Sequence, residues 1–407
     1  MAVANGFGKV VTSGSVFMYD TGDTVNSYRG EPTTNLYTTL GFSFYQAEGG
    51  HTALRTIGPA PLLNLQNNYD YHTITTDANW VSESKRLIIW PNNSLAASTS
   101  HYVSFWARVT NASTAQIGCA FYGSGINNTL NLTTEWQYFK FASTTHPNFR
   151  ALEFGSKSGA IIFQIAGLQI ELKSHATPYV NGTRSSTQGL LSLVGNSTID
   201  LSSVSFDSNA QIIFDGTDDT IDTGIPLTDL PALSNFSIEC IVKIDSYPSS
   251  TPPNGYGATY RCGVLVGATY YCGTALYWYG NSSGTICNIY AYTRGADAYR
   301  TAGEYNLTPG RYHHLILTND YTNGSINLYA NGILNGSAAT ATQEYNPGLT
   351  PDAGNIGISK AQVDGGGEAV YSNFLGQLPI TKIYKRALSA AEVRQNYNKY
   401  KTRFNLP

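Results

Sequence analysis

The sequence predicts an all-β protein made of two β-sandwich or jelly-roll domains, with a short C-terminal helix packed on the second. Charged residues make up only 13% of the 407 residues, while Gly (40) and Tyr (29) are abundant. This composition suits short strands joined by many turns and suits helices badly. Runs of alternating apolar and polar residues recur along the chain, as in strands that bury one face. A chain of this length has room for two or three such domains.

The first domain is expected at residues 36–185. Residues 101–110 and 136–141 alternate cleanly between apolar and polar, and residues 160–171 form the last long strand. The segment LQIELKSHATPYVNGTR (168–184) resembles the last strand and exit of carbohydrate-binding-module-like jelly rolls in phage fibres. The resemblance implies a jelly roll of that kind.

The second domain is expected at residues 186–407. Alternating runs predict strands at residues 236–244, 276–279, 312–318 and Ser325–Ala330. The dipeptide Asn331-Gly332 follows the last run and is a strong signal for a two-residue hairpin turn.

A helix is predicted near the C-terminus. Ser389 and Glu392 have the spacing of a capping box, and Leu388 and Val393 are placed as a hydrophobic staple. Apolar side chains then recur at i, i+4 and i+7, so one stripe of the helix can lie on a sandwich; they are Val393, Tyr397 and Tyr400.

Two segments of the second domain resemble a known family. SFDSNAQIIFDGTDDTIDTG (205–224) and IYKRALSAAEVRQNYNKYKTRF (383–404) resemble parts of the concanavalin A-like, laminin-G-like lectin domains found in bacteriophage structural proteins. The resemblance covers about residues 190–404 and implies a concanavalin A-like sandwich in a virion protein. For function it implies less, because this fold hosts lectins, glycosidases and passive structural modules.

The N-terminal segment, residues 1–35, poses a separate question. Residues 8–30 resemble the usual opening of the phage laminin-G-like proteins, where that stretch runs directly into the lectin fold. Here about 150 residues intervene, so we expect the middle domain to be inserted into the C-terminal one. Strand Ser15–Asp20 would then pair with the C-terminal sandwich. The alternative is an arm that docks on a neighbouring subunit.

A turn rich in aspartate offers a weak candidate calcium site. Asp215-Gly216 predicts a tight turn, which would bring four carboxylates close together; they belong to Asp215, Asp218, Asp219 and Asp222. Carboxylate oxygens suit calcium, but Pro226 stands at the twelfth position, where a calcium loop has an acid. A structural turn, with Asp side chains accepting turn amides, is therefore preferred. We expect no cofactor, with calcium as the one possibility.

Aromatic residues supply the candidates for glycan or partner binding. Residues 256–305 hold ten tyrosines and Trp278, and aromatic faces stack on sugar rings or form contact surfaces for proteins. Ordinary strand packing explains such residues equally well. The surface candidates are Tyr256, Tyr260, Tyr270, Tyr292, Trp80 and Trp90.

No pattern of catalytic residues stands out, and we expect a protein that is not an enzyme. Glycosidases of the resembled fold place two glutamates and an aspartate at alternate positions of one strand. Residues 236–244 offer Glu239 alone, and Glu171 has no acidic partner two positions away. Metalloprotease, nucleophile-elbow and phosphate-loop motifs are absent from the sequence.

The remaining features bound compartment and partners. The net charge of −3 gives no attraction to nucleic acid, and neither a membrane span nor a secretory signal is recognisable. Cys262 and Cys272 could pair in an oxidising environment, but reduced cysteines are preferred. Residues 382–403 carry seven Lys or Arg against one acid, as a solvated helix face or a contact for an acidic partner.

Together these features predict a virion surface protein, assembled in the host cytoplasm, on a tail fibre, a head fibre or a capsid. The expected partners are host-surface polysaccharide and other virion proteins, in a homo-oligomer. A purely structural decoration or joint protein is the alternative, and a polysaccharide depolymerase a more distant one.

Overall fold

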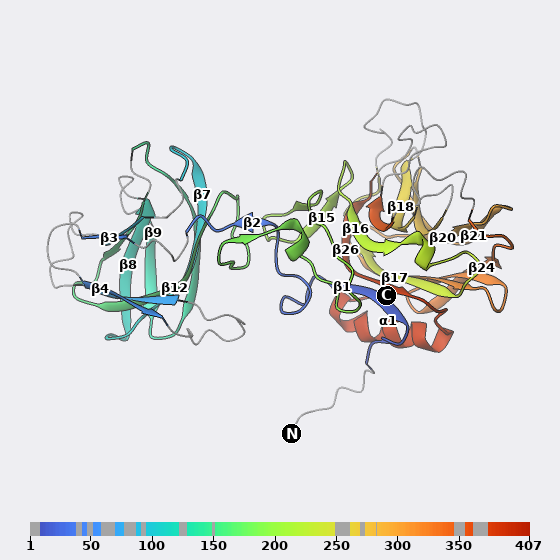
Figure 1. Ribbon diagram of the computed structural model, residues 1–407, viewed down its shortest axis with the longest axis horizontal. Helices are drawn as coiled ribbons and strands as arrows, with labels where there is room; N and C mark the ends of the chain where they lie inside the picture. Colours follow the sequence, from blue (N-terminus) through green and yellow to red (C-terminus); the bar gives the residue numbers. More distant parts are fainter. Residues whose placement is uncertain are drawn as a thin grey trace, which may run out of the picture. The chain divides into compact units, whose positions relative to one another are not determined.

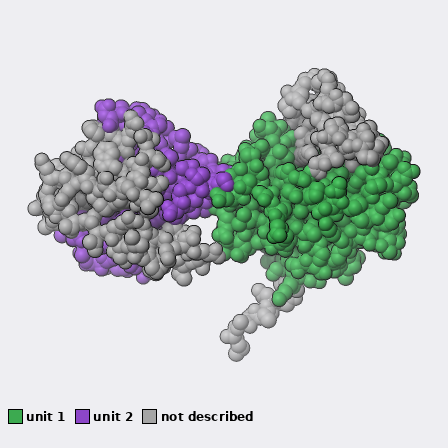
Figure 2. Space-filling model, viewed as in Figure 1, with its two compact units in different colours: residues 1–30, 186–207, 211–407 green, residues 31–185, 208–210 purple. Residues whose placement is uncertain are grey.

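The computed structural model divides into two compact units (Figure 2). Unit 1 comprises residues 1–30, 186–207 and 211–407, and unit 2 comprises residues 31–185 and 208–210. The structure describes residues 9–37, 43–46, 52–57, 70–76, 87–90, 95–121, 128–148, 151–248, 261–268, 273–281, 283–345, 355–360 and 373–407.

The described strands of unit 1 form two sheets that pack face to face. The first runs in the order β14-β15-β26-β17-β22-β23-β24, with β1 also beside β26. Its strands are β1 (Ser15–Asp20), β14 (Ser205–Phe206), β15 (Ile212–Asp215), β17 (Phe236–Lys243), β22 (Tyr312–Asp320), β23 (Ser325–Ala330), β24 (Ile333–Ala339) and β26 (Leu375–Tyr384). The second sheet contains, in spatial order, β16 (Ile221–Pro226), β25 (Asn355–Lys360), β18 (Arg261–Gly267), β19 (Thr274–Gly280), β20 (Cys287–Arg294) and β21 (Tyr299–Asn306).

A single large core lies between these two sheets. Alternate residues of each strand enter it, among them Phe236 of β17 and Trp278 of β19, which are both buried. The Trp278 ring meets Phe374 edge-on at a centroid distance of 6.0 Å. Short 3-10 helices, Ser186–Gln188 and Leu227–Asp229, connect strands at the rim.

The N-terminal segment contributes a strand to unit 1. The strand β1 pairs antiparallel with β26, where Met18 lies opposite Lys382 and Asp20 opposite Ile380. The Tyr19 hydroxyl donates to the Leu378 carbonyl at 2.7 Å. Residues 31–185 leave and re-enter unit 1 at neighbouring points of the chain. An isolated antiparallel bridge between Tyr28 and Leu190 joins the two flanking segments.

Unit 2 is also a sandwich in its described part. One sheet contains, in spatial order, β10 (Gln137–Thr144), β7 (Ser100–Val109), β12 (Ile162–Glu171), β5 (Asp70–Thr75) and β4 (Thr52–Ile57). The other contains β3 (Ser43–Gln46), β6 (Leu87–Trp90), β11 (Leu152–Ser156), β8 (Thr114–Phe121) and β9 (Asn128–Thr133). Phe105, Phe154 and Phe163 pack in the core between them. The ends of the unit meet where β2 (Thr33–Thr34) pairs with β13 (Thr183–Arg184). The predicted all-β fold with two sandwiches is confirmed.

The predicted C-terminal helix is α1 (Ala390–Phe404), which lies against the eight-stranded sheet (Figure 1). The capping box is present, since the Ser389 side chain accepts from the Glu392 amide and the Glu392 side chain accepts from the Ser389 amide. Leu388 and Val393 share one apolar cluster, and Tyr397 and Tyr400 pack on Ile241 and Ile380. No helix within the described ranges has the length and apolarity needed to span a membrane.

A buried carboxylate ties this helix to the sheet. Glu239 of β17 is fully buried and accepts from Lys382 Nζ at 3.2 Å, from the Tyr384 hydroxyl at 2.9 Å and from Asn396 Nδ2 of α1 at 2.7 Å. His314 Nε2 lies 3.0 Å from Glu239 Oε1, the oxygen that also accepts from Lys382. Burial alone would raise the pKa of Glu239, but the Lys382 ammonium and the hydrogen bonds outweigh it and lower the pKa to about 2.

We predict that Glu239→Ala lowers the free energy of unfolding by about 3–5 kcal/mol, because it leaves the buried Lys382 ammonium without a counter-charge. Urea unfolding followed by circular dichroism measures this. The matched control is Asp229→Ala, which removes a half-exposed ion pair with Lys385 and should change stability by about 1 kcal/mol or less. Similar losses in both variants would contradict the role given to Glu239.

The same carboxylate predicts a pH dependence. A depressed pKa stabilises the folded state above the unfolded value, about 4.3 for Glu, and that contribution disappears as the pH falls toward 2. The difference in unfolding free energy between the wild type and Glu239→Gln should therefore be largest at about pH 7. It should shrink as the pH falls from about 4.5 to about 2, the range between the unfolded and folded pKa values. A difference that stays constant over this range would refute it.

Candidate functional site

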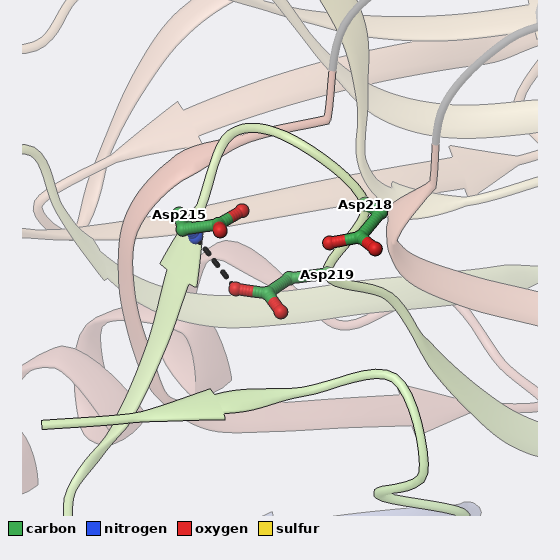
Figure 3. Close-up of side chains that lie close together, drawn as sticks. All are labelled: Asp215, Asp218 and Asp219. Carbon is green, nitrogen blue, oxygen red and sulfur yellow. Dashed lines mark hydrogen bonds between the residues drawn. The ribbon is translucent and has the colours of Figure 1, made fainter.

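The aspartate turn joins β15 to β16 at the rim of unit 1 (Figure 3). One oxygen of each of Asp215, Asp218 and Asp219 lies within 4.8 Å of the others, and the first two residues are exposed while Asp219 is buried. Asp219 accepts from the Asp215 amide at 2.7 Å and, with its other oxygen, from the Ser205 amide at 2.9 Å and hydroxyl at 3.0 Å. Asp219 thus holds β14 and the turn together.

The fourth predicted member, Asp222, lies outside this cluster, which corrects the expectation that all four carboxylates meet. Its side chain accepts from the Gly224 amide and from Asn355 Nδ2 instead, because strand alternation within β16 directs it away from the turn. Burial raises the pKa of Asp219, against the opposing effect of its hydrogen bonds. Both Asp219 oxygens are occupied by protein donors, so the turn fits a structural role better than a calcium site.

A second candidate is the tyrosine face, the side of β19, β20 and β21 that points away from the core. Its rings and one hydroxyl line a cavity of about 200 Å³; they are Tyr277, Tyr279, Tyr290, Tyr292 and Thr301. Drug-sized ligands usually occupy pockets of about 300–1,000 Å³, so this hollow is small. Around it, Arg294 lies 4.3 Å above the Tyr299 ring, and Asn288 Nδ2 donates to Glu304 at 2.5 Å.

The structure corrects the assignment of Tyr292 to the surface. Tyr292 does lie on the face opposite the core, but its side chain is only 2% exposed. Tyr277 and Tyr299 approach its ring at centroid distances of 6.3 Å and 6.0 Å and cover it. Tyr256, Tyr260, Tyr270 and Trp80 lie outside the described residues, as do the side chains of Trp90, Cys262 and Cys272.

The sequence patterns had not pointed to a further candidate in unit 2, the aromatic platform formed by Trp106 and Tyr138. On the outer face of the β10-β7-β12 sheet, Tyr138 and Trp106 are directly opposite across strands, with ring centroids 5.0 Å apart. Tyr138 is 42% exposed. Trp106 also lies opposite Ala166 of β12, and Trp106, Trp136 and Tyr179 pack on this small, buried side chain.

Polar groups adjoin this platform two positions further along β7. Arg108 donates from Nε to Gln164 at 2.8 Å, and Gln164 Nε2 donates to the Thr73 hydroxyl at 3.0 Å. The Arg108 guanidinium also lies 4.8 Å above the Trp136 ring. Trp136 Nε1 is buried and has no hydrogen-bond partner among the described residues. Aromatic planes beside a guanidinium and a carboxamide are the groups that sugar recognition uses.

The alternation of residues 101–110 was the signal that could have located the platform. It places Tyr102, Ser104, Trp106 and Arg108 on one face of β7, opposite the core residues Val103 and Phe105. Attention to long aromatic and basic residues on that polar face would have singled out Trp106.

The two glutamates considered for catalysis have structural partners. Glu239 lies under α1, as described above. Glu171 of β12 is buried and accepts from the Thr33 hydroxyl at 2.7 Å and the Thr177 hydroxyl at 2.6 Å. Each of these two carboxylates is therefore held by neighbouring side chains of its own unit.

We predict that Asp219→Ala lowers the free energy of unfolding by about 1–3 kcal/mol, since it removes the acceptor of two partly buried amides and a hydroxyl. Asp218→Ala, in the same turn but exposed, should change the free energy of unfolding by less than about 0.5 kcal/mol.

Thermal unfolding with and without millimolar calcium tests whether the turn also binds metal. A clear rise of Tm on adding calcium, lost in Asp218→Ala, would show that the turn is a metal site.

Comparisons with known proteins found distant structural likenesses and a matching family. Among solved structures, the chain is similar to Trypanosoma rangeli sialidase in complex with 2,3-difluorosialic acid, at 12% identity over 86% of this chain and 53% of that one (TM-score 0.35). It is similar to the botulinum neurotoxin serotype D binding domain at 14% identity, over 52% and 49% (0.37). It is also similar to Ruminococcus gnavus IT-sialidase CBM40 bound to α2,3-sialyllactose, at 15% identity over 40% of this chain and 80% of that one (TM-score 0.29).

The chain thus spans about half the length of the sialidase and neurotoxin structures. At TM-scores below 0.5, none of these likenesses bears on function. No curated protein matches the sequence. Residues 215–394 match the family described as the concanavalin A-like lectin/glucanases superfamily, and this stretch runs from the aspartate turn into α1. The chain therefore contains a concanavalin A-like lectin/glucanase domain.

Proposed function

We propose that this protein is a non-enzymatic, glycan-binding component of a bacteriophage virion surface. The observation that carries the glycan-binding part is the aromatic platform of Trp106 and Tyr138, with Arg108 and Gln164 two positions away. The lectin-like fold of unit 1 supports the same activity. The platform is preferred to the tyrosine face because the hollow of that face is small, about 200 Å³, and one of its lining rings, Tyr292, is covered.

The chemistry of the platform suits a saccharide. The C–H face of a pyranose ring is apolar and packs on an aromatic plane, while its hydroxyls need donors and acceptors at the edge. Trp106 and Tyr138 offer adjoining planes tilted by 42°, and Gln164 holds the Arg108 guanidinium in place. Because the strands fix both rings, little side-chain freedom is lost on binding.

The virion location rests on the resemblance of residues 205–224 and 383–404 to phage laminin-G-like proteins. A virion displays many copies of each surface protein, so weak single sites gain strength through multivalency. A homo-oligomer presented to host-surface polysaccharide fits this arrangement.

The second candidate is a purely structural role, as a decoration or joint protein that contacts other virion proteins. The large exposed aliphatic side chains of Ile333 and Leu334 in unit 1 favour it. A polysaccharide depolymerase is a more distant candidate, since both oxygens of the buried acid Asp219 accept protein hydrogen bonds.

We predict that Trp106→Ala and Tyr138→Ala each weaken binding of host-cell surface polysaccharide by about tenfold or more, because each removes a stacking plane. Biolayer interferometry on the purified chain measures the affinity. The matched control is Tyr321→Ala, which removes a tyrosine of similar exposure, 40%, from a turn in unit 1. We also expect no release of reducing ends from the polysaccharide.

Two results would contradict the proposal. Absence of polysaccharide binding by the folded wild type would refute glycan recognition, and equal weakening by Tyr321→Ala would refute its assignment to the platform. Release of reducing ends would instead establish an enzyme.

A further inference from the structure

A groove runs between α1 and the hairpin formed by β23 and β24. It encloses about 620 Å³, which is within the range of ligand pockets. Arg394, Asn398 and Lys401 line it from one face of the helix, at the i, i+4, i+7 spacing. Ile333 and Leu334 line it from β24.

The floor of the groove is held by hydrogen bonds. Asn331 Nδ2 donates to the Tyr305 hydroxyl at 2.7 Å, and Asn331 Oδ1 accepts from the His314 amide at 3.0 Å. The hairpin turn has positive φ at both Asn331 (49°) and Gly332 (79°). A Cβ at Gly332 would lie 2.8 Å from the Tyr397 ring, so the glycine lets the helix pack directly on the turn.

The basic side chains that line the groove make no ion pair within the described chain. Four of the seven basic residues at 382–403 have acidic partners; the pairs are Lys382–Glu239, Lys385–Asp229, Arg386–Glu392 and Arg403–Asp20. Arg394, Lys399 and Lys401 are exposed and make no ion pair among the described residues. Two of these three line the groove.

The opposite wall is aliphatic and exposed. The Ile333 side chain is 68% exposed and the Leu334 side chain 50%. Neighbours in a strand normally point to opposite faces. However, β24 is the edge strand of its sheet, and its pairing with β23 is irregular, since Leu328 pairs with Gly336 but Tyr329 with Leu334. Adjacent exposed aliphatic residues are typical of a surface that another protein covers, whereas sugars favour aromatic planes.

We propose that this groove binds an acidic, aliphatic segment of another protein. Carboxylates of the segment would meet Arg394 and Lys401, which lie about 10 Å apart along the helix axis at 1.5 Å per residue. An apolar side chain between them would pack on Ile333, Leu334 and the Tyr397 ring. The match of charge and apolar surface selects this partner, and the site is separate from the glycan platform.

An array of synthetic ten-residue peptides, in which acidic and aliphatic content vary independently, tests the proposal on the full chain. We expect binding only to peptides that have both. The double variant Arg394→Glu/Lys401→Glu and the double variant Ile333→Ser/Leu334→Ser should each weaken it by about tenfold or more. If the charge-reversal variant does not fold, Arg394→Gln/Lys401→Gln replaces it as the test of the basic side chains.

Two matched controls accompany these variants. Lys399→Glu makes the same charge change on α1 outside the groove, and Leu172→Ser removes an aliphatic side chain of similar exposure, 61%, from unit 2. Unchanged binding in both controls supports the proposal. The proposal is overturned if Lys399→Glu weakens binding equally or if no peptide binds. It is also overturned if heparin oligosaccharides bind in place of peptides, or if the wild type forms dimers that the groove variants dissociate.

Discussion

Alternation along a strand is the constraint on which this structure depends. Successive side chains point to opposite faces, so each sheet buries one face in a sandwich core and presents the other. In unit 1 the outer face of the eight-stranded sheet is covered by α1. The buried Glu239 carboxylate makes that covering specific, because it binds groups from β26, from β22 and from the helix at once. Removing one member of such a network leaves charges buried without compensation.

Where aromatic side chains on an outer sheet face are exposed among the described residues, they are available for recognition. The β10-β7-β12 sheet of unit 2 presents Trp106 and Tyr138 beside Arg108 on such a face, whereas the tyrosine face of unit 1 is crowded by its own rings. The aspartate turn, in contrast, uses its carboxylates internally, since Asp219 caps the amides of Asp215 and Ser205. Accessibility, more than residue type, therefore separates the binding candidates from the structural ones.

Much of the fold was predictable because its signals are local. The period-2 runs marked strands, and the Ser389 capping box marked the start of α1. The site was less predictable because it depends on contacts distant in sequence. Glu239 looked solitary in the sequence because its partners lie 75 to 157 residues away. Likewise, alternation places Tyr292 on the outer face of β20 but does not reveal that Tyr277 and Tyr299 cover it.

The central claim is that the aromatic platform of unit 2, Trp106 and Tyr138, recognises saccharide. The most direct measurement follows the five tryptophan indole N–H signals by NMR while host-surface polysaccharide is added. The account predicts that the Trp106 and Trp136 signals shift with saturation, while the signal of the core residue Trp278 stays in place. Polysaccharide binding that leaves the Trp106 and Trp136 signals unmoved would contradict it.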